Sequence, residues 1–276
     1  MPSKLAIPLA TLAALGAATP AAADTLLVPA TGAQHLAGGG GYAAWSAPAG
    51  DGRFKLVVRE PGGAVADAPI STFRAPVDPS IGSTRTAFPR SLVAVYSRCA
   101  GSTCAVWQYD LRTRRERRLA ALGNATAPSV SYGSYAFVRR AQGTFVKPEG
   151  EPARRVDTAS ARETAITESR VVYLTPGDQI RWRSVFAGRV RTIGRAPRGR
   201  AFSLVATRYR IGWLQREGGR VAAKLSDRIE GGSASVRTGR RTLPASTTGA
   251  SMNATNVDRY LDAGGLHRVT PNLFAP

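Results

Sequence analysis

The side chains that most often carry chemistry are few in this chain and lie far apart. Its two histidines, His35 and His267, belong to no His-x-His or His-x-x-x-His pair of the kind that binds metal. A serine hydrolase would need a nucleophile on a strained turn, and no Gly-x-Ser-x-Gly sequence occurs. Gly38–Gly41 precedes an expected strand, so it lacks the helix-start N–H groups that hold phosphate. We therefore expect no metal, no cofactor and no enzymatic activity.

Paired carboxylates are the remaining route to catalysis, because glycoside cleavage requires one acid and one base or nucleophile. The chain has 18 acidic residues, mostly near expected turns, where such residues usually cap and solubilise. Asp258 and Asp262, which flank Tyr260, are the candidate pair. A carbohydrate-active enzyme would further require acidic residues to gather at one end of the molecule.

Arginine supplies most of the formal net charge of +20. The densest group is a run of candidate polyanion contacts: Arg112, Arg114, Arg115, Arg117 and Arg118. Such a surface attracts anionic envelope polymers or lipid headgroups. No aromatic ladder accompanies the arginines, as binding to single-stranded nucleic acid would require. We favour a solvated arginine-rich exterior, keep polyanion adhesion as an alternative, and expect no nucleic-acid partner.

The first residues and the two cysteines indicate export. Lys4 precedes an apolar run from Leu5 to Ala18, and Ala21-x-Ala23 fits the small-residue rule for signal-peptide cleavage after Ala23. We assign residues 1–23 to a signal peptide and residues 24–276 to one mature domain, secreted or periplasmic and not membrane-spanning. Because the compartment is oxidising, Cys99 and Cys104 are expected to form a disulfide across the turn between two neighbouring strands.

A recurring hairpin must position all of these side chains. Its clearest copy runs from Val171 to Arg183, with two β-rich runs around a Pro-Gly-Asp turn. Large aromatic residues mark six copies, 51, 41, 36, 40 and 47 residues apart: Trp45, Tyr96, Phe137, Tyr173, Trp213 and Tyr260. Four short strands per copy at such a period are typical of propeller blades. We predict an all-β fold, a six-bladed β-propeller of four-stranded blades, in preference to a β-sandwich.

The repeat also predicts how the ring closes. Too few residues follow Tyr260 to complete a blade, while Thr25–Val28 precedes the first blade as a spare strand. Thr25–Val28 is therefore predicted to be the outermost strand of the last blade. This closure would place His35 and His267 in adjacent blades. Thr72–Pro89 and Gly231–Met252 fall outside the repeat and are expected to be excursions from it.

One copy carries a family resemblance. Val106–Thr113, followed by Arg117-Arg118-Leu119, resembles the repeat of periplasmic TolB-type and WD40-like propellers: a strand ending in Asp, a Thr-containing turn, and basic residues before Leu. The Ser-Pro-Asp-Gly sequence that usually precedes the aromatic strand of those repeats is missing from every copy.

The resemblance implies a rigid interaction platform. We expect a bacterial, exported, monomeric and non-catalytic propeller that binds a protein or a cell-envelope polymer. A carbohydrate-active enzyme with carboxylates at the propeller funnel and an arginine-mediated polyanion adhesin are the alternatives.

Overall fold

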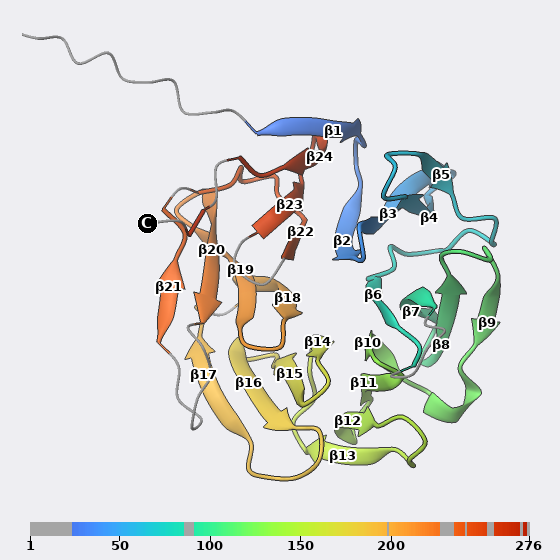
Figure 1. Cartoon of the computed structure of the whole chain (residues 1–276), viewed down its shortest axis with the longest axis vertical. Coiled ribbons are helices and arrows are strands. Elements are labelled where there is room, and N and C mark those ends of the chain that lie inside the picture. The colour runs from blue at the N-terminus through green and yellow to red at the C-terminus, as the bar shows by residue number, and fades with distance from the viewer. Residues whose placement is uncertain are drawn as a thin grey trace, which may run out of the picture.

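Six antiparallel sheets of four strands each form a ring around a central channel in the computed structural model (Figure 1). The structure describes residues 24–85, 91–197, 199–226, 235–240, 242–252, 257–270 and 273–274. The predicted signal peptide, residues 1–23, lies outside the described residues. No helix in the described part of the chain is long and apolar enough to cross a membrane.

Each sheet is one blade, and its first strand in the chain lies nearest the channel, except that blade 6 also takes in β1 (Figure 1). Blade 1 contains β2 (Gln34–Gly39), β3 (Tyr42–Gly50), β4 (Arg53–Arg59) and β5 (Val65–Asp67). Blade 2 contains β6 (Ser80–Ser83), β7 (Leu92–Ala100), β8 (Thr103–Asp110) and β9 (Glu116–Arg118). Blade 3 contains β10 (Thr126–Ser131), β11 (Ser134–Arg139), β12 (Gly143–Lys147) and β13 (Arg154–Asp157).

The other half of the ring follows the same plan. Blade 4 contains β14 (Glu163–Ile166), β15 (Arg170–Leu174), β16 (Gln179–Ser184) and β17 (Arg191–Arg195). Blade 5 contains β18 (Ala201–Ala206), β19 (Ile211–Glu217), β20 (Arg220–Ser226) and β21 (Val236–Thr238). Blade 6 contains β22 (Gly249–Met252), β23 (Val257–Leu261), β24 (Gly265–Arg268) and, outermost, β1 (Thr25–Pro29). A short 3-10 helix, η1 (Ala120–Leu122), links blades 2 and 3.

The aromatic residues that define the repeat all occupy the second strand of their blade. Each is at least 96% buried: Trp45, Tyr96, Phe137, Tyr173, Trp213 and Tyr260. They belong to six separate apolar clusters, and each cluster lies between two neighbouring blades. The core is therefore a set of six inter-blade layers, which is why one large buried side chain recurs in every copy. The predicted six-bladed propeller is confirmed.

The N-terminal strand closes the ring as predicted. β1 pairs with β24 in antiparallel register, with Thr25 opposite Arg268 and Pro29 opposite Gly265. Leu261 and Leu266 of blade 6 then pack with Trp45 of blade 1 in a shared apolar cluster. The first and last segments of the propeller are thus joined both by backbone hydrogen bonds and by buried side chains.

The prediction that two segments are excursions outside the repeat is wrong. Thr72–Pro89 contains β6, the innermost strand of blade 2, and Gly231–Met252 contains both β21 and β22. These strands are only three or four residues long. β6 and β22 are rich in Gly and Ser, and β21 has a single apolar residue, so none shows a period-2 apolar pattern and their pairing depends on the neighbouring strands.

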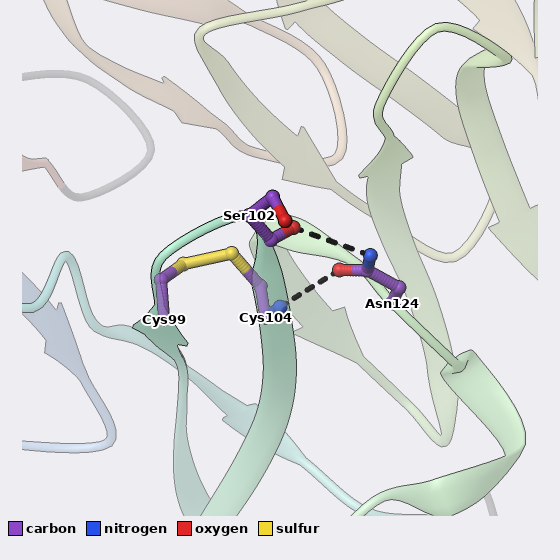
Figure 2. The surroundings of a disulfide bond; sticks show 4 residues. All are labelled: Cys99, Ser102, Cys104 and Asn124. Atoms are coloured by element: carbon purple, nitrogen blue, oxygen red, sulfur yellow. Dashed lines mark hydrogen bonds between the residues drawn. A yellow bond between two sulfur atoms is a disulfide. The ribbon is translucent and has the colours of Figure 1, made fainter.

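The predicted disulfide joins Cys99 and Cys104 across the β7–β8 hairpin, with a Cα–Cα distance of 4.0 Å (Figure 2). Asn124, in the link to blade 3, supports this turn from the side. Its Oδ1 accepts a hydrogen bond from the Cys104 N–H at 2.8 Å, and its Nδ2 donates to the Ser102 carbonyl at 3.4 Å (Figure 2).

Candidate functional site

Three inner strands carry a β-bulge at the same end of the channel. The register shifts between Gln34 and Ala37 in β2, and the equivalent parts of β10 and β18 shift likewise. Each bulge contains a non-glycine residue with positive φ: His35 at 56°, Ala127 at 46° and Ser203 at 54°. Such residues are uncommon, and bulges are over-represented at barrel rims and beside active sites. Alternate blades 1, 3 and 5 therefore have a reshaped inner edge at this mouth.

The blades between them supply acidic residues. Asp78 lies two residues before β6 of blade 2, and Glu163 is the first residue of β14 in blade 4. Blade 6 contributes Thr248, just before β22, whose hydroxyl donates to the Ala33 carbonyl at 3.1 Å. Asp78, Glu163 and Thr248 border one small recess together with His35 and Ser203. The repeat thus brings side chains from five blades to one mouth.

A cavity of about 670 Å³ lies next to these side chains, on the side away from the channel axis. Its wall includes the segment before β6 and the disulfide hairpin, and His35, Asp78 and Glu163 form its inner edge. A narrower space of about 130 Å³ continues into the channel, and Asp78 and Glu163 border it as well. The two carboxyl groups therefore stand at the threshold between the cavity and the channel. A volume of this size falls within the range of small-ligand sites.

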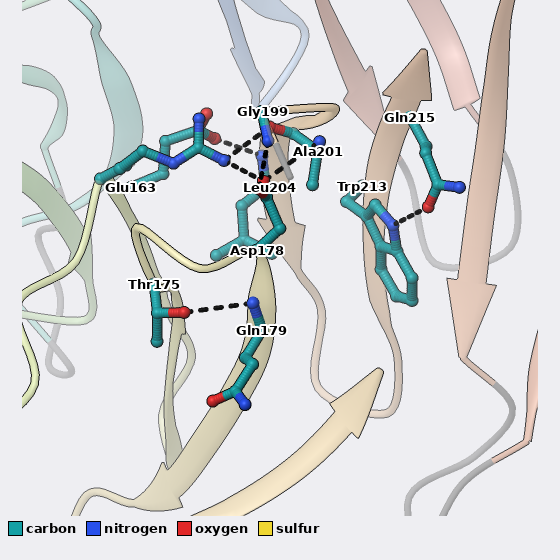
Figure 3. Close-up of polar contacts among 10 residues, drawn as sticks. Glu163, Thr175, Asp178, Gln179, Gly199, Ala201, Leu204, Trp213 and Gln215 are labelled. Atoms are coloured by element: carbon teal, nitrogen blue, oxygen red, sulfur yellow. Dashed lines mark hydrogen bonds and ion pairs between the residues drawn. The ribbon is translucent and has the colours of Figure 1, made fainter. Parts of the chain in front are cut away.

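The two carboxyl groups have perturbed proton affinities. The protein around the mouth partly desolvates Asp78 and raises its pKa to about 6, although the side chain keeps contact with cavity solvent. Burial, and then the charge of Asp78, raise the pKa of Glu163 to about 7. The Leu204 N–H in the β18 bulge donates to Glu163 Oε2 at 2.7 Å, a contact that favours the ionised form (Figure 3). Carboxyl groups with raised pKa values in a cleft occur often at ligand and catalytic sites, and also in structural networks.

Asp78 and His35 are the least constrained members of the group. The carboxylate of Asp78 accepts no hydrogen bond from any described residue, and its nearest ionic neighbour is His35 Nδ1 at 3.7 Å. The Asp78 side chain is 47% exposed, and the solvent that contacts it is the water of the cavity. Burial lowers the pKa of His35, against the opposing charge of Glu163. A ligand in the cavity would therefore meet an acceptor, Asp78, to which none of the described residues donates.

Four arginines line the outer wall, and two are neutralised by the protein. Arg98 forms an ion pair with Glu116, and Arg162 forms one with Asp178. The guanidinium of Arg53 donates to the Thr72 carbonyl at 3.0 Å. Arg74 has no hydrogen bond or ion pair with any described residue and is exposed. The cavity thus combines acidic groups at its inner edge with cationic groups on its wall.

The predicted arginine cluster is not part of this mouth. Arg112, Arg114 and Arg115 lie in the β8–β9 turn, at the other end of β8 from the Cys104 that borders the disulfide hairpin. Arg114 forms an ion pair with Glu60 at 2.9 Å. Two more of the cluster, Arg117 and Arg118, lie on the outermost strand β9. The run therefore spreads along the far end and outer edge of blade 2.

The structure does not bring the candidate acids Asp258 and Asp262 together, because they lie at opposite ends of β23. Asp258 accepts a hydrogen bond from the Ser251 hydroxyl at 2.8 Å. Asp262 closes the β23–β24 turn by accepting the Gly264 N–H at 2.8 Å, and it also contacts His267 Nε2 at 3.0 Å.

The possible approach of the two histidines is not seen either. His267 stacks on Tyr260 with ring centroids 4.8 Å apart and contacts Asp262, whereas His35 faces Asp78. The two side chains therefore belong to separate sets of contacts.

Sequence reasoning missed Asp78 and Glu163. Asp78 belongs to Thr72–Pro89, which the repeat pattern leaves out, so the sequence does not show that Asp78 precedes an inner strand. Glu163 begins the clearest four-strand copy, and the rule that the start of every inner strand faces one mouth would have selected it. The requirement that acids gather at one mouth is met by these two residues instead of Asp258 and Asp262.

Comparison with known proteins places the chain by its fold. No protein-family model and no curated protein sequence matches it. A gluconolactonase from Xanthomonas campestris is similar in structure, with a TM-score of 0.55 and 12% identity over 88% of both chains. A chain of the mitotic checkpoint complex gives a TM-score of 0.56 and 9% identity over 98% of both chains.

TolB from Acinetobacter baumannii is also similar, with a TM-score of 0.50 and 13% identity over 74% of this chain. The match takes in 52% of TolB, so this chain spans about half the length of that protein. At these identities the similarity shows the fold alone. At that level it confirms the resemblance to TolB-type and WD40-like propellers.

Proposed function

We propose that the protein is a binding propeller that holds a polar ligand in the mouth formed by His35, Asp78 and Glu163. The observation that supports this most is the position of two carboxyl groups with raised pKa values at the threshold of a cavity of about 670 Å³. The blades fix the mouth rigidly, while the segments between them are free to vary, which suits a recognition surface. Binding would use only the side chains that the mouth already contains.

The chemistry of the mouth narrows the class of ligand. An ionised carboxylate can only accept hydrogen bonds, so Asp78 and Glu163 require a donor such as an ammonium group or sugar hydroxyls. Arg74 on the cavity wall would suit an acidic group on the same ligand. In this proposal residues 1–23 are removed on export, residues 24–276 act as one monomeric domain, and the ligand is presented by a protein or polymer of the cell envelope.

Affinity capture tests the proposal. The mature chain, residues 24–276, is immobilised and exposed to an envelope fraction of its own host at low and high salt. We expect a discrete partner that is retained at high salt and whose capture falls at least tenfold in the Asp78→Asn/Glu163→Gln variant, because hydrogen bonds to charged groups contribute about 1.5–3 kcal/mol each. The Glu151→Gln/Glu168→Gln variant, with two exposed carboxylates removed away from the mouth, should capture as the wild type does.

Two outcomes would contradict the proposal. Equal capture by both double variants would remove the mouth from the binding surface. Diffuse capture that disappears at high salt would favour the arginine-mediated polyanion adhesin, because contacts of that kind weaken steeply with salt.

A second function is favoured by the same carboxyl pair. A general acid works best when its pKa lies near the operating pH, and the pKa values of Asp78 and Glu163 are raised toward neutrality. The test is a panel of glycosides and lactones, the second class chosen because one structural neighbour is a gluconolactonase. Turnover by the wild type that is lost in Asp78→Asn/Glu163→Gln would establish an enzyme. Binding of these compounds without turnover would support the binding function instead.

A further inference from the structure

The seam between blades 6 and 1, where the ring closes, changes character along its length. Near its middle it is apolar, because Trp45 and Val57 of blade 1 pack with Leu261 and Leu266 of blade 6. Side chains two residues apart on a strand share a face. Arg59 and Arg268 lie two residues after Val57 and Leu266, and Arg259 lies two residues before Leu261, so all three face this same seam.

The strand registers place the three arginines in one layer. Arg259 of β23 is directly opposite Arg268 of β24, and Arg59 of β4 is opposite Ala43 of β3. The guanidinium of Arg259 crosses the seam and donates to the Tyr42 carbonyl, next to Ala43, at 3.1 Å. β2 runs from His35 at the mouth to Gly39, which pairs with Tyr42. The layer therefore lies at the end of the ring opposite the channel mouth.

Among the described residues, this arginine triad is paired with a single carboxylate, so most of its positive charge is not balanced there. Burial, followed by the charges of Arg259 and Arg268, lowers the pKa of Arg59. Arg59 Nε is buried without a hydrogen-bond partner among the described residues. The acidic neighbour is Asp258, whose Oδ2 is 4.0 Å from Arg259 Nε and whose other oxygen accepts the Ser251 hydroxyl. An unsatisfied buried donor beside like charges costs free energy, so an anionic partner would stabilise this end of the seam.

We propose that Arg59, Arg259 and Arg268 form a binding site for a phosphate group, either free phosphate or a phosphate monoester. The planar fork of each guanidinium matches phosphate oxygens in pairs, and one phosphate can accept from several arginines at once. Arg268 is exposed and Arg59 is partly exposed, so a phosphate can approach the pair from solvent. The Arg59 side chain would turn toward the phosphate, and its buried Nε would then gain the acceptor that it lacks. The site is independent of the ligand site proposed at the channel mouth.

Thermal unfolding of the mature chain in sodium phosphate and in sodium chloride of equal ionic strength and pH tests this site. We expect a saturable rise in Tm with phosphate, roughly 3–6 °C at a concentration about tenfold above Kd. Arg59→Gln and Arg268→Gln should each weaken phosphate binding at least tenfold, as measured by calorimetric titration. In chloride alone these variants should unfold at or above the wild-type temperature, because they relieve repulsion within the triad.

Arg118→Gln is the matched control. It removes the same charge from an exposed arginine on an outermost strand, whose side chain makes no hydrogen bond or ion pair with a described residue, and it should keep the full response to phosphate. An equal response in all three variants, or no saturable response in the wild type, would overturn the proposal. So would a variant that unfolds far below the wild type in chloride, since the arginines would then stabilise the fold without an anion.

Three probes distinguish the kinds of phosphate that the site could bind: inorganic phosphate, glycerol 3-phosphate, and phosphatidylglycerol vesicles. Binding of either soluble probe, lost in Arg59→Gln, supports the free ion or the monoester according to which binds more tightly. Binding of the vesicles alone would contradict the proposal, because a diester headgroup would then be the ligand. The capture experiment on the mouth variants is unaffected by any of these outcomes.

Discussion

Two sets of carboxylates at the same end of the propeller have opposite surroundings. Asp178, in the β15–β16 turn, is completely buried and forms an ion pair with Arg162. It also accepts hydrogen bonds from the N–H groups of Gly199 and Ala201 (Figure 3). Asp78 and Glu163 have few donors and face a cavity. The first carboxylate is satisfied by the protein itself, whereas the second set leaves acceptor capacity for something else.

The number of protein donors separates structural from functional acids in this fold. Asp178 joins blade 4 to the segment that leads into blade 5, so its hydrogen bonds hold two blades together. Asp157 and Glu116 are similar, since each accepts a buried tyrosine hydroxyl and an arginine, from Tyr173 and Tyr96 among others. A carboxylate with its full set of donors is part of the framework. Asp78 does not meet that description.

The largest expected effect is on the structural side of the comparison. Asp178→Ala would leave the partly exposed Arg162 and two backbone N–H groups without their acceptor. We expect a loss of about 3 kcal/mol in the free energy of unfolding, measured by urea denaturation, because breaking a buried pair strands its partner. The same measurement on Asp78→Ala should show a change within about 0.5 kcal/mol. Comparable losses in both variants would erase the distinction between the two sets.

The disulfide should have the next largest effect. Cys99→Ser/Cys104→Ser removes a cross-link that closes a short loop, and the chain-entropy model gives about 2 kcal/mol for such a loop. The bridge stands in the wall of the cavity, and Cys99 lies beyond the part of β7, Leu92–Val95, that pairs with β6, so we expect Asp78 to keep its position without the bridge. Urea denaturation should therefore show reduced stability, while capture of the envelope partner persists. Loss of capture in this variant would make the hairpin, instead of the acids, the main contact.

The smallest expected effect concerns pH. The pKa values of Asp78 and Glu163 in the folded protein lie above their ordinary values of 3.8 and 4.5. The folded state therefore retains protons that the unfolded state loses between about pH 4 and pH 7, and the stability contribution of the pair falls across that window. The pKa of His35 is lowered instead of raised. His35 is present in both the wild type and the double variant, so it does not affect their comparison.

Measurement of Tm from pH 4 to pH 8 checks this sign. Asp78→Asn/Glu163→Gln should match the wild type near pH 4 and become the more stable protein by pH 8. The expected difference is on the order of 1 kcal/mol or less, because cavity water screens the Asp78 charge. A difference that shrinks as the pH rises would show that the ionised pair is stabilised by the fold and is structural, like Asp178.

The sequence by itself determined the architecture of this protein. An aromatic residue recurs on one strand of every copy because each inter-blade layer needs one large buried side chain, and such local repetition is visible without coordinates. The spare Thr25–Val28 strand predicted the closure for the same reason, since an incomplete blade must be completed by some other strand. The disulfide followed from two cysteines on either side of a single hairpin turn.

Only the tertiary structure decided where the acids and arginines meet. Asp78 and Glu163 are far apart in the chain and approach each other because two inner strands begin at one mouth. Arg59, Arg259 and Arg268 come together because ring closure sets the first blade against the last. Composition and spacing record which side chains a strand carries, whereas a site depends on which strands become neighbours, and that is fixed by packing across the whole ring.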